Sequence, residues 1–129
     1  MSRRYLIDTH CWLWWNGDPG RLSGPARSII ADGHSDILFS VASAWEISIK
    51  HGLGKLALPS IPAKYLPARL SSNRIQVLPV LLHHALAVGD LPQHHCDPFD
   101  RILIAQALAE DLVIITADEV FQRYDVPLL

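Results

Sequence analysis

Cysteine and long hydrophobic runs are both scarce in this sequence of 129 residues. Its two cysteines, Cys11 and Cys96, have a spacing that fits neither a disulfide framework nor a zinc-binding pattern, which suits a reducing compartment. No run of about 18 apolar residues is present that could span a membrane, and the segment 1–8 lacks the hydrophobic stretch of a secretion signal. These absences predict a soluble, cytoplasmic protein with no membrane contact.

Acidic residues are missing from a long middle segment. None occurs between Glu46 and Asp90, although the formal net charge of the whole chain is only −2. The same segment carries several basic side chains, so it is a candidate surface for nucleic acid or for an acidic partner. An ordinary solvated helical face is the alternative interpretation. The basic side chains are Lys50, Lys55, Lys64, Arg69 and Arg74.

The alternation of apolar segments with helical patterns indicates the fold class. Hydrophobic residues make up 50% of the chain, which is enough for a substantial core in one domain, residues 1–129. Strands that alternate with helices predict an α/β fold, with a parallel sheet covered by helices on both faces. The predicted strands are 4–8, 36–40, 75–80 and 112–118, with 126–129 as a further edge strand.

One predicted helix, residues 97–108, begins with two carboxylates. Pro98 suits the first helical position, where its missing N–H has no partner, and Asp97 then suits the N-cap. Asp100 lies where the positive end of the helix dipole stabilises negative charge. Because Asp97 already caps the helix, Asp100 is free to face whatever lies beyond that end.

Three further acids are expected at one edge of the sheet. Asp8 and Asp118 end strands, and Glu46 lies near the start of the helix that follows the second strand. Each acid has a local alternative, because Asp8 and Asp118 could be N-caps. Glu46 could form a capping box with Ser43, or it could lie deeper in the helix if Ser40 is the cap.

The topology brings these acids together. In a parallel sheet every strand ends, and every following helix begins, on the same edge. Separate capping roles do not explain why all the acids fall there, and a cluster of like charges is costly unless a cation lies between them. Carboxylate oxygens favour Mg²⁺ or Mn²⁺. The clustered acids are Asp8, Glu46, Asp100 and Asp118.

A run of potential zinc ligands offers a different metal site. Residues 94–97 read His-His-Cys-Asp, which supplies nitrogen, sulfur and oxygen donors in sequence. Adjacent side chains of an extended segment point to opposite faces, so these four do not easily converge on one ion. The run is therefore a weaker candidate than the four acids.

Five groups of motifs follow one another along nearly the whole chain. They are Leu-Ile-Asp-Thr-His at 6–10, Ser-Ala-Trp-Glu-Ile-Ser-Ile-Lys at 43–50, Leu-Gly-Lys-Leu at 53–56, Asp-Pro-Phe-Asp-Arg at 97–101 with Ile-Ala-Gln-Ala at 104–107, and Thr-Ala-Asp at 116–118. In this order and spacing the sequence resembles the PIN-domain ribonucleases, and within them the VapC toxins of VapBC toxin–antitoxin pairs. The resemblance implies a PIN-like three-layer α/β/α sandwich with a central parallel sheet of four to five strands.

The resemblance also implies an activity and its site. It implies a metal-dependent endoribonuclease, the toxin of a type II toxin–antitoxin pair, which hydrolyses RNA with a water activated by Mg²⁺ or Mn²⁺. The resemblance matches the acidic quartet of the family to Asp8, Glu46, Asp100 and Asp118. We expect Asp8, Asp100 and Asp118 to be the principal metal ligands. Glu46 is expected to bind the ion or to orient the water, and Asp97 to add an outer metal contact.

Partners follow from the resemblance and from composition. The resemblance implies a VapB-type antitoxin and an RNA substrate, whose backbone the basic middle segment would hold, while Thr9 and Thr116 support the acids. A homodimer is expected because the apolar content is high and the four tryptophans cannot all be buried easily in so small a chain. These tryptophans are Trp12, Trp14, Trp15 and Trp45.

Two other functions are compatible with such a sheet. A catalytically silent PIN-like module would bind RNA or protein without cutting, but the presence of all four acids argues against it. A small Mg²⁺-dependent phosphatase or phosphotransfer domain would need a phosphate-holding lysine after a strand. No lysine follows a predicted strand end in this sequence.

Overall fold

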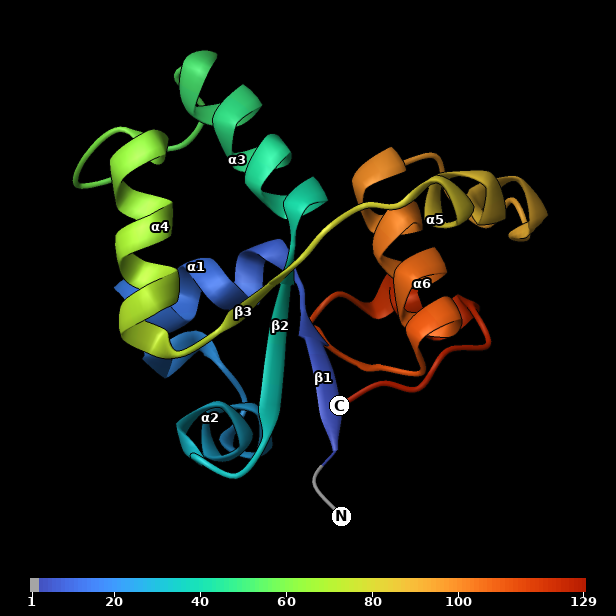
Figure 1. Ribbon diagram of the computed structural model, residues 1–129, viewed down its shortest axis with the longest axis horizontal. Coiled ribbons are helices and arrows are strands. Elements are labelled where there is room, and N and C mark those ends of the chain that lie inside the picture. Colours follow the sequence, from blue (N-terminus) through green and yellow to red (C-terminus); the bar gives the residue numbers. More distant parts are fainter. Residues whose placement is uncertain (1–2) are drawn as a thin grey trace.

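A computed structural model describes residues 3–129 and contains a parallel sheet of four strands (Figure 1). The strands lie in the order β3-β2-β1-β4, and each neighbouring pair is parallel. This confirms the α/β fold class that the sequence predicts. The strand bounds are β1 Arg4–Ile7, β2 Asp36–Ser40, β3 Gln76–Leu78 and β4 Val113–Ile115.

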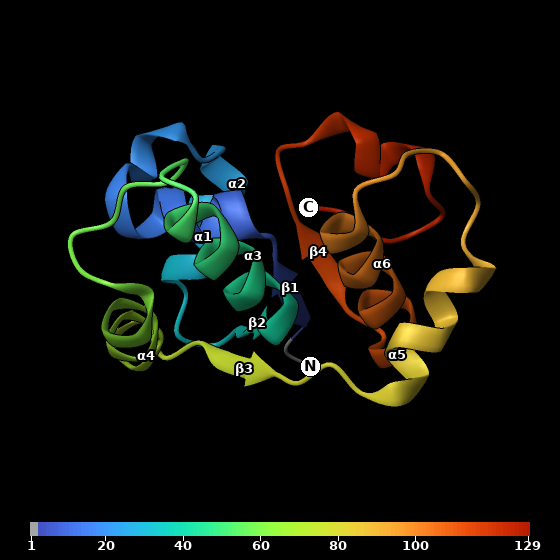
Figure 2. The ribbon, with the colours of Figure 1, turned by 90° about the horizontal axis from the view of Figure 1, so that it is seen from above.

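Helices cover both faces of the sheet. Figures 1 and 2 show α1, α2 and α4 on one side of the sheet and α5 and α6 on the other, while α3 extends from the end of β2. No helix within residues 3–129 has the length and apolar character needed to cross a bilayer. The bounds are α1 Thr9–Gly17, α2 Gly24–Ala31, α3 Val41–Gly52, α4 Pro62–Asn73, α5 Leu82–Ala87 and α6 Pro98–Glu110, with 3₁₀ turns at Pro19–Arg21, Val88–Asp90 and Glu119–Arg123.

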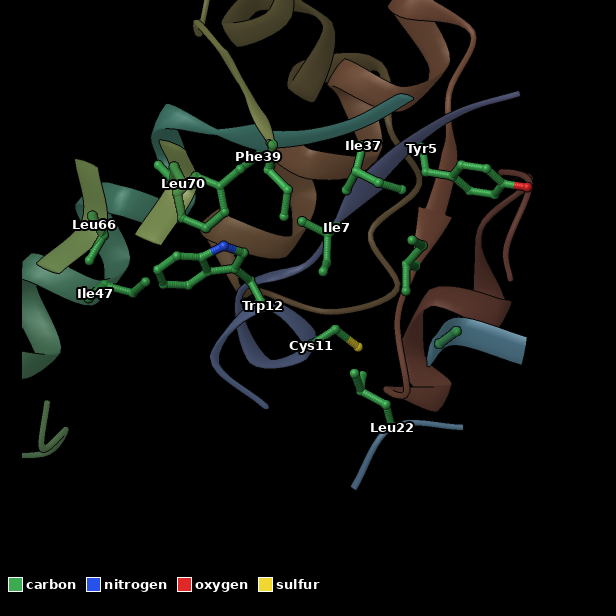
Figure 3. Packing of buried hydrophobic residues seen from close by; sticks show 13 residues of the cluster. Tyr5, Ile7, Cys11, Trp12, Leu22, Ile37, Phe39, Ile47, Leu66 and Leu70 are labelled. Atoms are coloured by element: carbon green, nitrogen blue, oxygen red, sulfur yellow. The ribbon is translucent and has the colours of Figure 1, made fainter. Parts of the chain in front are cut away.

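The strands bury both of their faces, as the alternation of their side chains requires. In β1, Ile7 belongs to the apolar cluster under α1 to α4, whereas its neighbour Leu6 belongs to the cluster under α6. Trp12 of α1 is fully buried and packs on Phe39 of β2, with ring centroids 4.9 Å apart (Figure 3). This packing fixes the positions of the strand ends and of the residues that follow them.

The predicted strand 36–40 keeps its bounds, whereas 4–8, 75–80 and 112–118 shorten to Arg4–Ile7, Gln76–Leu78 and Val113–Ile115. Residues 126–129 make only an isolated bridge between Ile114 and Leu128, in place of the predicted edge strand. The Ile114 N–H bonds to the Pro127 carbonyl at 2.9 Å, but Pro127 has no N–H with which to extend the ladder. The third strand ends at Leu78 because Pro79 follows it.

Candidate active site

The carboxyl-terminal edge of the sheet gathers the predicted acids. Asp8 directly follows β1, and Asp118 follows β4 after two further residues. Glu46 lies in the second turn of α3, which begins where β2 ends. Because the far end of α6 leads into the start of β4, the first turn of α6, with Asp100, lies at this same edge. We call Asp8, Glu46, Asp100 and Asp118 the acid cluster.

Asp8 is both a helix cap and a member of the acid cluster. Its Oδ1 accepts the Cys11 N–H at 2.7 Å and so caps α1, while its Oδ2 accepts the Thr116 hydroxyl at 2.6 Å. The two roles are compatible because a carboxylate has two oxygens. Burial raises the pKa of the Asp8 carboxyl above its usual value, although the Thr116 hydrogen bond acts in the opposite direction.

Glu46 does not form a capping box with Ser43. Ser40 is the N-cap of α3, so Glu46 lies deeper in the helix and is buried. Its Oε1 accepts the Thr9 hydroxyl at 2.7 Å, and its Oε2 pairs with the Lys50 ammonium at 2.6 Å. The carboxylate is therefore held from both sides, by a hydroxyl from α1 and by a cation from its own helix.

Asp100 shows most clearly that the acids act on one another. Burial and nearby negative charge raise the pKa of its carboxyl from the usual 3.8 to about 7. Like charges in a partly buried position disfavour ionisation unless a cation neutralises them. The contributing charges, from largest to smallest, are those of Asp97, Glu46, Asp118 and Asp8.

Asp97 and Asp118 both cap helical turns. Asp97 Oδ1 accepts the N–H groups of Phe99 at 2.9 Å and Asp100 at 3.3 Å, which confirms the predicted N-cap of α6. Asp118 Oδ1 accepts the Val120 N–H at 3.1 Å. Both residues are exposed, and within residues 3–129 the Oδ2 of each accepts no hydrogen bond. Each capping acid thus keeps one oxygen for a ligand.

Two hollows adjoin the acid cluster. The larger is an apolar cavity of about 440 Å³, lined in part by Trp45 and Phe99, whose rings meet edge-on with centroids 5.3 Å apart. These two aromatic residues directly neighbour Glu46 and Asp100 in the sequence. A second cavity, of about 210 Å³, is lined by Asp8, His10, Trp14, Ala117 and Asp118.

The sequence was compared with those of known protein families. Residues 5–127 match the PIN domain family. The chain belongs to the PIN domain family. A stretch of 59 residues is 44% identical to Ribonuclease VapC16 of Mycobacterium tuberculosis (strain ATCC 25618 / H37Rv). That stretch covers 46% of this chain and 40% of the relative, so less than half of the curated protein is matched.

Several solved structures share this fold. VapBC2 from Rickettsia felis, bound to a promoter DNA fragment, matches with a TM-score of 0.71 at 17% identity over 98% of this chain and 97% of that chain. DNA-bound VapBC from Salmonella typhimurium has a TM-score of 0.71 at 18% identity, covering 100% and 98%. FitAcB from Neisseria gonorrhoeae has a TM-score of 0.61 at 18% identity, covering 97% and 96%. These likenesses confirm the predicted PIN-like α/β/α sandwich.

One of the five predicted basic residues contacts the acid cluster of this PIN domain. Lys50, whose side chain is 40% exposed, pairs with Glu46. Lys55 follows the end of α3 and Lys64 lies in the first turn of α4, and both are exposed. Neither side chain forms a hydrogen bond or an ion pair with an acid of the cluster among the described contacts.

The other two basic residues lie elsewhere. Arg69 of α4 donates its Nε–H to Asn16 Oδ1 at 2.8 Å, so its charge is directed toward the end of α1. Arg74 ends α4 just before β3 and therefore lies at the amino-terminal edge of the sheet, opposite the acids. The structure does not gather the five basic side chains at the acid cluster.

A trio of possible metal ligands lies away from the acids. Within residues 3–129, His83, His84 and Glu110 bring their ligand atoms within 4.8 Å of one another. Glu110 is about 15 Å from Asp100 along α6, at 1.5 Å per residue. His84 Nδ1 accepts the Leu81 N–H at 2.9 Å, so the neutral ring carries its hydrogen on Nε2 and offers that nitrogen as a donor. This protonation does not suit a metal ligand.

Sequence analysis missed the polar residues behind Asp100. For His95 the sequence suggests only a role as a zinc ligand, yet its ring lies between Asp100 and Tyr124. Arg101 is buried and donates to the Tyr124 hydroxyl at 3.0 Å. The position of His95 two residues before the motif 97–101 could have indicated a contact with the acids. Tyr124 had none, because only folding brings it near.

Proposed function

We propose that this PIN domain is a metal-dependent endoribonuclease, the VapC-type toxin of a type II toxin–antitoxin pair. The convergence of four carboxylates at one sheet edge carries the proposal, with Asp8 and Glu46 held there by Thr116 and Thr9. The partial match to a named ribonuclease supports the same chemistry. The family match over residues 5–127 supports a single domain spanning residues 1–129.

The donor set of the acid cluster fits Mg²⁺ or Mn²⁺. The donors are carboxylate oxygens without thiols or imidazoles among them, which is the ligand type these hard cations prefer. A cation here would also relieve the repulsion that raises the pKa of Asp100. We assign Asp8, Asp100 and Asp118 as principal ligands, Glu46 as a ligand or water-orienting residue, and Asp97 as an outer contact.

The chain holds these acids ready for hydrolysis of an RNA phosphodiester. When bound, the ion lowers the pKa of a water molecule and neutralises charge on the phosphate. Thr116 fixes the Asp8 carboxylate, and Thr9 fixes that of Glu46. Since the Thr9 hydroxyl has one hydrogen and donates it to Glu46, its oxygen accepts from the Ser43 hydroxyl, 2.8 Å away. Thr9 and Ser43 thereby fix the orientation of the Glu46 carboxylate.

RNA is proposed to approach along the basic end of α3. Lys50, Lys55 and Lys64 would contact phosphates, giving an affinity that is independent of sequence and falls with salt. Arg69 is engaged by a neighbour and Arg74 lies at the opposite edge, so we assign neither of them to this path. An RNA substrate places the proposed activity in the cytoplasm.

The proposed partner is a VapB-type antitoxin. The solved structures that share this fold include VapBC complexes, which supports such a partner for this chain. A VapC-type toxin purified alone should then be inhibited when its VapB is added, without loss of its fold.

We also propose a homodimer, because large apolar side chains remain at the surface. Trp12 is fully buried, but Trp45 is 63% exposed and Leu82 is 75% exposed. Such exposure favours burial against a second copy. Sedimentation at roughly tens of micromolar, without any partner, should show a dimer if apolar burial drives association. A monomer under these conditions contradicts this part of the proposal.

The alternative function is a catalytically silent module that binds RNA or protein. Loss of one or more acids would mark such a module, whereas all four acids are present here. Its RNA affinity would depend on salt but not on a chelator.

One experiment separates the two functions. A purified, antitoxin-free sample is incubated with structured RNA in Mg²⁺ and in EDTA, beside the Asp118→Asn variant, whose fold is checked by circular dichroism. We expect cutting by the wild type in Mg²⁺ only, at single-stranded or looped positions. Undiminished cleavage in EDTA, or by the variant, contradicts the metal mechanism. Tight RNA binding without cleavage under any metal supports the silent module.

A further inference from the structure

A chain of polar groups from three parts of the sequence ends on the Asp100 carboxylate. His95 Nε2 lies 3.4 Å from Asp100 Oδ2, and His95 Nδ1 lies 2.7 Å from the Tyr124 hydroxyl. The Tyr124 hydroxyl in turn lies 3.0 Å from Nη1 of Arg101. Within residues 3–129, His95 is the one hydrogen-bonding partner of the Asp100 side chain.

The donors and acceptors in this chain fix the hydrogen positions. A guanidinium only donates, so the Tyr124 oxygen accepts from Arg101 and the hydroxyl hydrogen remains for His95. His95 Nδ1 therefore accepts that hydrogen, and the neutral ring carries its own hydrogen on Nε2. This N–H is directed at the Asp100 carboxylate.

Burial makes this chain a rigid support. Tyr124 and Arg101 are each about 5% exposed. Arg101 also donates to the carbonyl oxygens of Pro92 at 2.8 Å and Val88 at 3.2 Å. The guanidinium thus ties α6 to the segment that leads to His95. A displacement of the His95 ring would leave the hydroxyl hydrogen of the buried Tyr124 without its acceptor.

We propose that His95 is a positioning residue that orients Asp100 toward the metal site. The N–H of His95 holds one carboxylate oxygen, so the other oxygen keeps a fixed direction toward the acid cluster. Hydrogen bonds behind a carboxylate ligand orient it and tune its affinity for a metal. The inference rests on the metal-dependent function proposed above, and it adds His95, Tyr124 and Arg101 to the parts of the site.

Two amide substitutions of His95 test the role. In His95→Gln the side-chain amide nitrogen takes the place of Nε2 and can still donate to Asp100, whereas in His95→Asn it takes the place of Nδ1. Mn²⁺ affinity of the metal-free protein is measured by electron paramagnetic resonance. We expect His95→Asn to weaken Mn²⁺ binding about tenfold and His95→Gln to stay within about threefold of the wild type.

His94→Asn is the matched control. The His94 ring also packs against Tyr124, with centroids 4.9 Å apart, but no hydrogen bond joins it to Asp100 among the described contacts. This variant should bind Mn²⁺ like the wild type. Thermal unfolding in EDTA checks that each variant is folded. Should His95→Asn fail to fold, Tyr124→Phe takes its place, because it removes the hydroxyl that fixes the His95 hydrogen.

A second measurement does not depend on metal. Nitrogen-15 chemical shifts of the imidazole distinguish the two tautomers of the neutral ring. We expect the Nε2–H form of His95 in the wild type and a mixture of both forms in Tyr124→Phe. A dominant Nδ1–H form in the wild type contradicts the proposed hydrogen positions.

The outcomes separate this inference from the proposed function. Wild-type Mn²⁺ affinity in His95→Asn, or equal losses in His95→Asn and His95→Gln, overturns the positioning role alone. If Asp100→Asn binds Mn²⁺ as tightly as the wild type, the metal site itself is wrong and the positioning role fails with it. If His95→Asn weakens Mn²⁺ binding and His95→Gln binds Mn²⁺ like the wild type, both the metal site and the positioning role are supported.

Discussion

The hydroxyl of Thr116 donates to Oδ2 of Asp8 across 2.6 Å, which joins the end of β4 to the end of β1. The same hydroxyl accepts the Asp118 N–H at 3.0 Å. One side chain therefore sets the positions of two members of the acid cluster. Asp8 and Thr116 are 108 positions apart in the sequence, so the contact depends on the pairing of β1 with β4.

Removal of this hydroxyl should destabilise the protein. Thr116→Val keeps the side-chain shape but leaves the buried Asp8 oxygen without its donor, so the free energy of unfolding should fall by about 2 kcal/mol at neutral pH. Thr116→Ser keeps the donor and should recover most of the loss. Urea denaturation measures both. In an Asp8→Asn background the cost of Thr116→Val should shrink, and an unchanged cost would contradict the assigned contact.

Stability of the metal-free protein should fall as the pH rises from about 4 to about 7. In this window the folded state keeps a proton on Asp100, whose pKa is raised to about 7, while the unfolded chain has already lost it. The folded state thus binds more protons, and the free energy of unfolding decreases with pH. Burial of Asp8 acts in the same direction.

Asp100→Asn is the control for this pH dependence. At 1.36 kcal/mol per pKa unit, Asp100 contributes about 4 kcal/mol at most between the two ends of the window. The variant should lose that part of the slope and be more stable than the wild type in EDTA at neutral pH. Denaturation curves at several pH values test this, and parallel curves for the two proteins would count against the like-charge cluster.

Magnesium or manganese should stabilise the wild type. An ion at tenfold its dissociation constant adds about 1.4 kcal/mol to the free energy of unfolding, which corresponds to a rise of about 5 °C in the melting temperature. EDTA should reverse the rise. Asp8→Asn, which loses one of the proposed ligands, should show little or none of it, and an equal rise in that variant would place the ion elsewhere.

Neutralising Lys50 should have opposite effects on two ligands. Its ammonium lies 2.6 Å from Glu46 Oε2, so Lys50→Gln frees a carboxylate oxygen and should strengthen Mn²⁺ binding by about threefold. The same variant should bind RNA more weakly, with a salt slope reduced by about 1. Lys64→Gln should lower the salt slope without changing Mn²⁺ affinity. Weaker Mn²⁺ binding by Lys50→Gln would contradict the idea that Lys50 and the ion compete for the Glu46 carboxylate.

Local sequence patterns are sufficient to predict the sheet and the edge on which the acids lie. Apolar segments that alternate with helical patterns require a parallel sheet, and parallel strands all end on one side. Asp8, Asp118 and the helix start at Asp97 could therefore be placed from local patterns alone. The fold class and the N-cap of α6 are confirmed because both depend on short-range rules.

The groups that hold those acids could not be predicted in the same way, because they come from distant segments of the chain. By sequence pattern, Ser40 and Ser43 are equally acceptable N-caps for the helix that contains Glu46. Ser40 is the N-cap because β2 ends there. The donor to Glu46 comes from Thr9, 37 positions away, and the support behind His95 comes from Tyr124, 29 positions away. Periodicity and capping rules describe neighbours along the chain. Contacts between side chains of different elements depend on strand pairing and packing, which no single segment specifies.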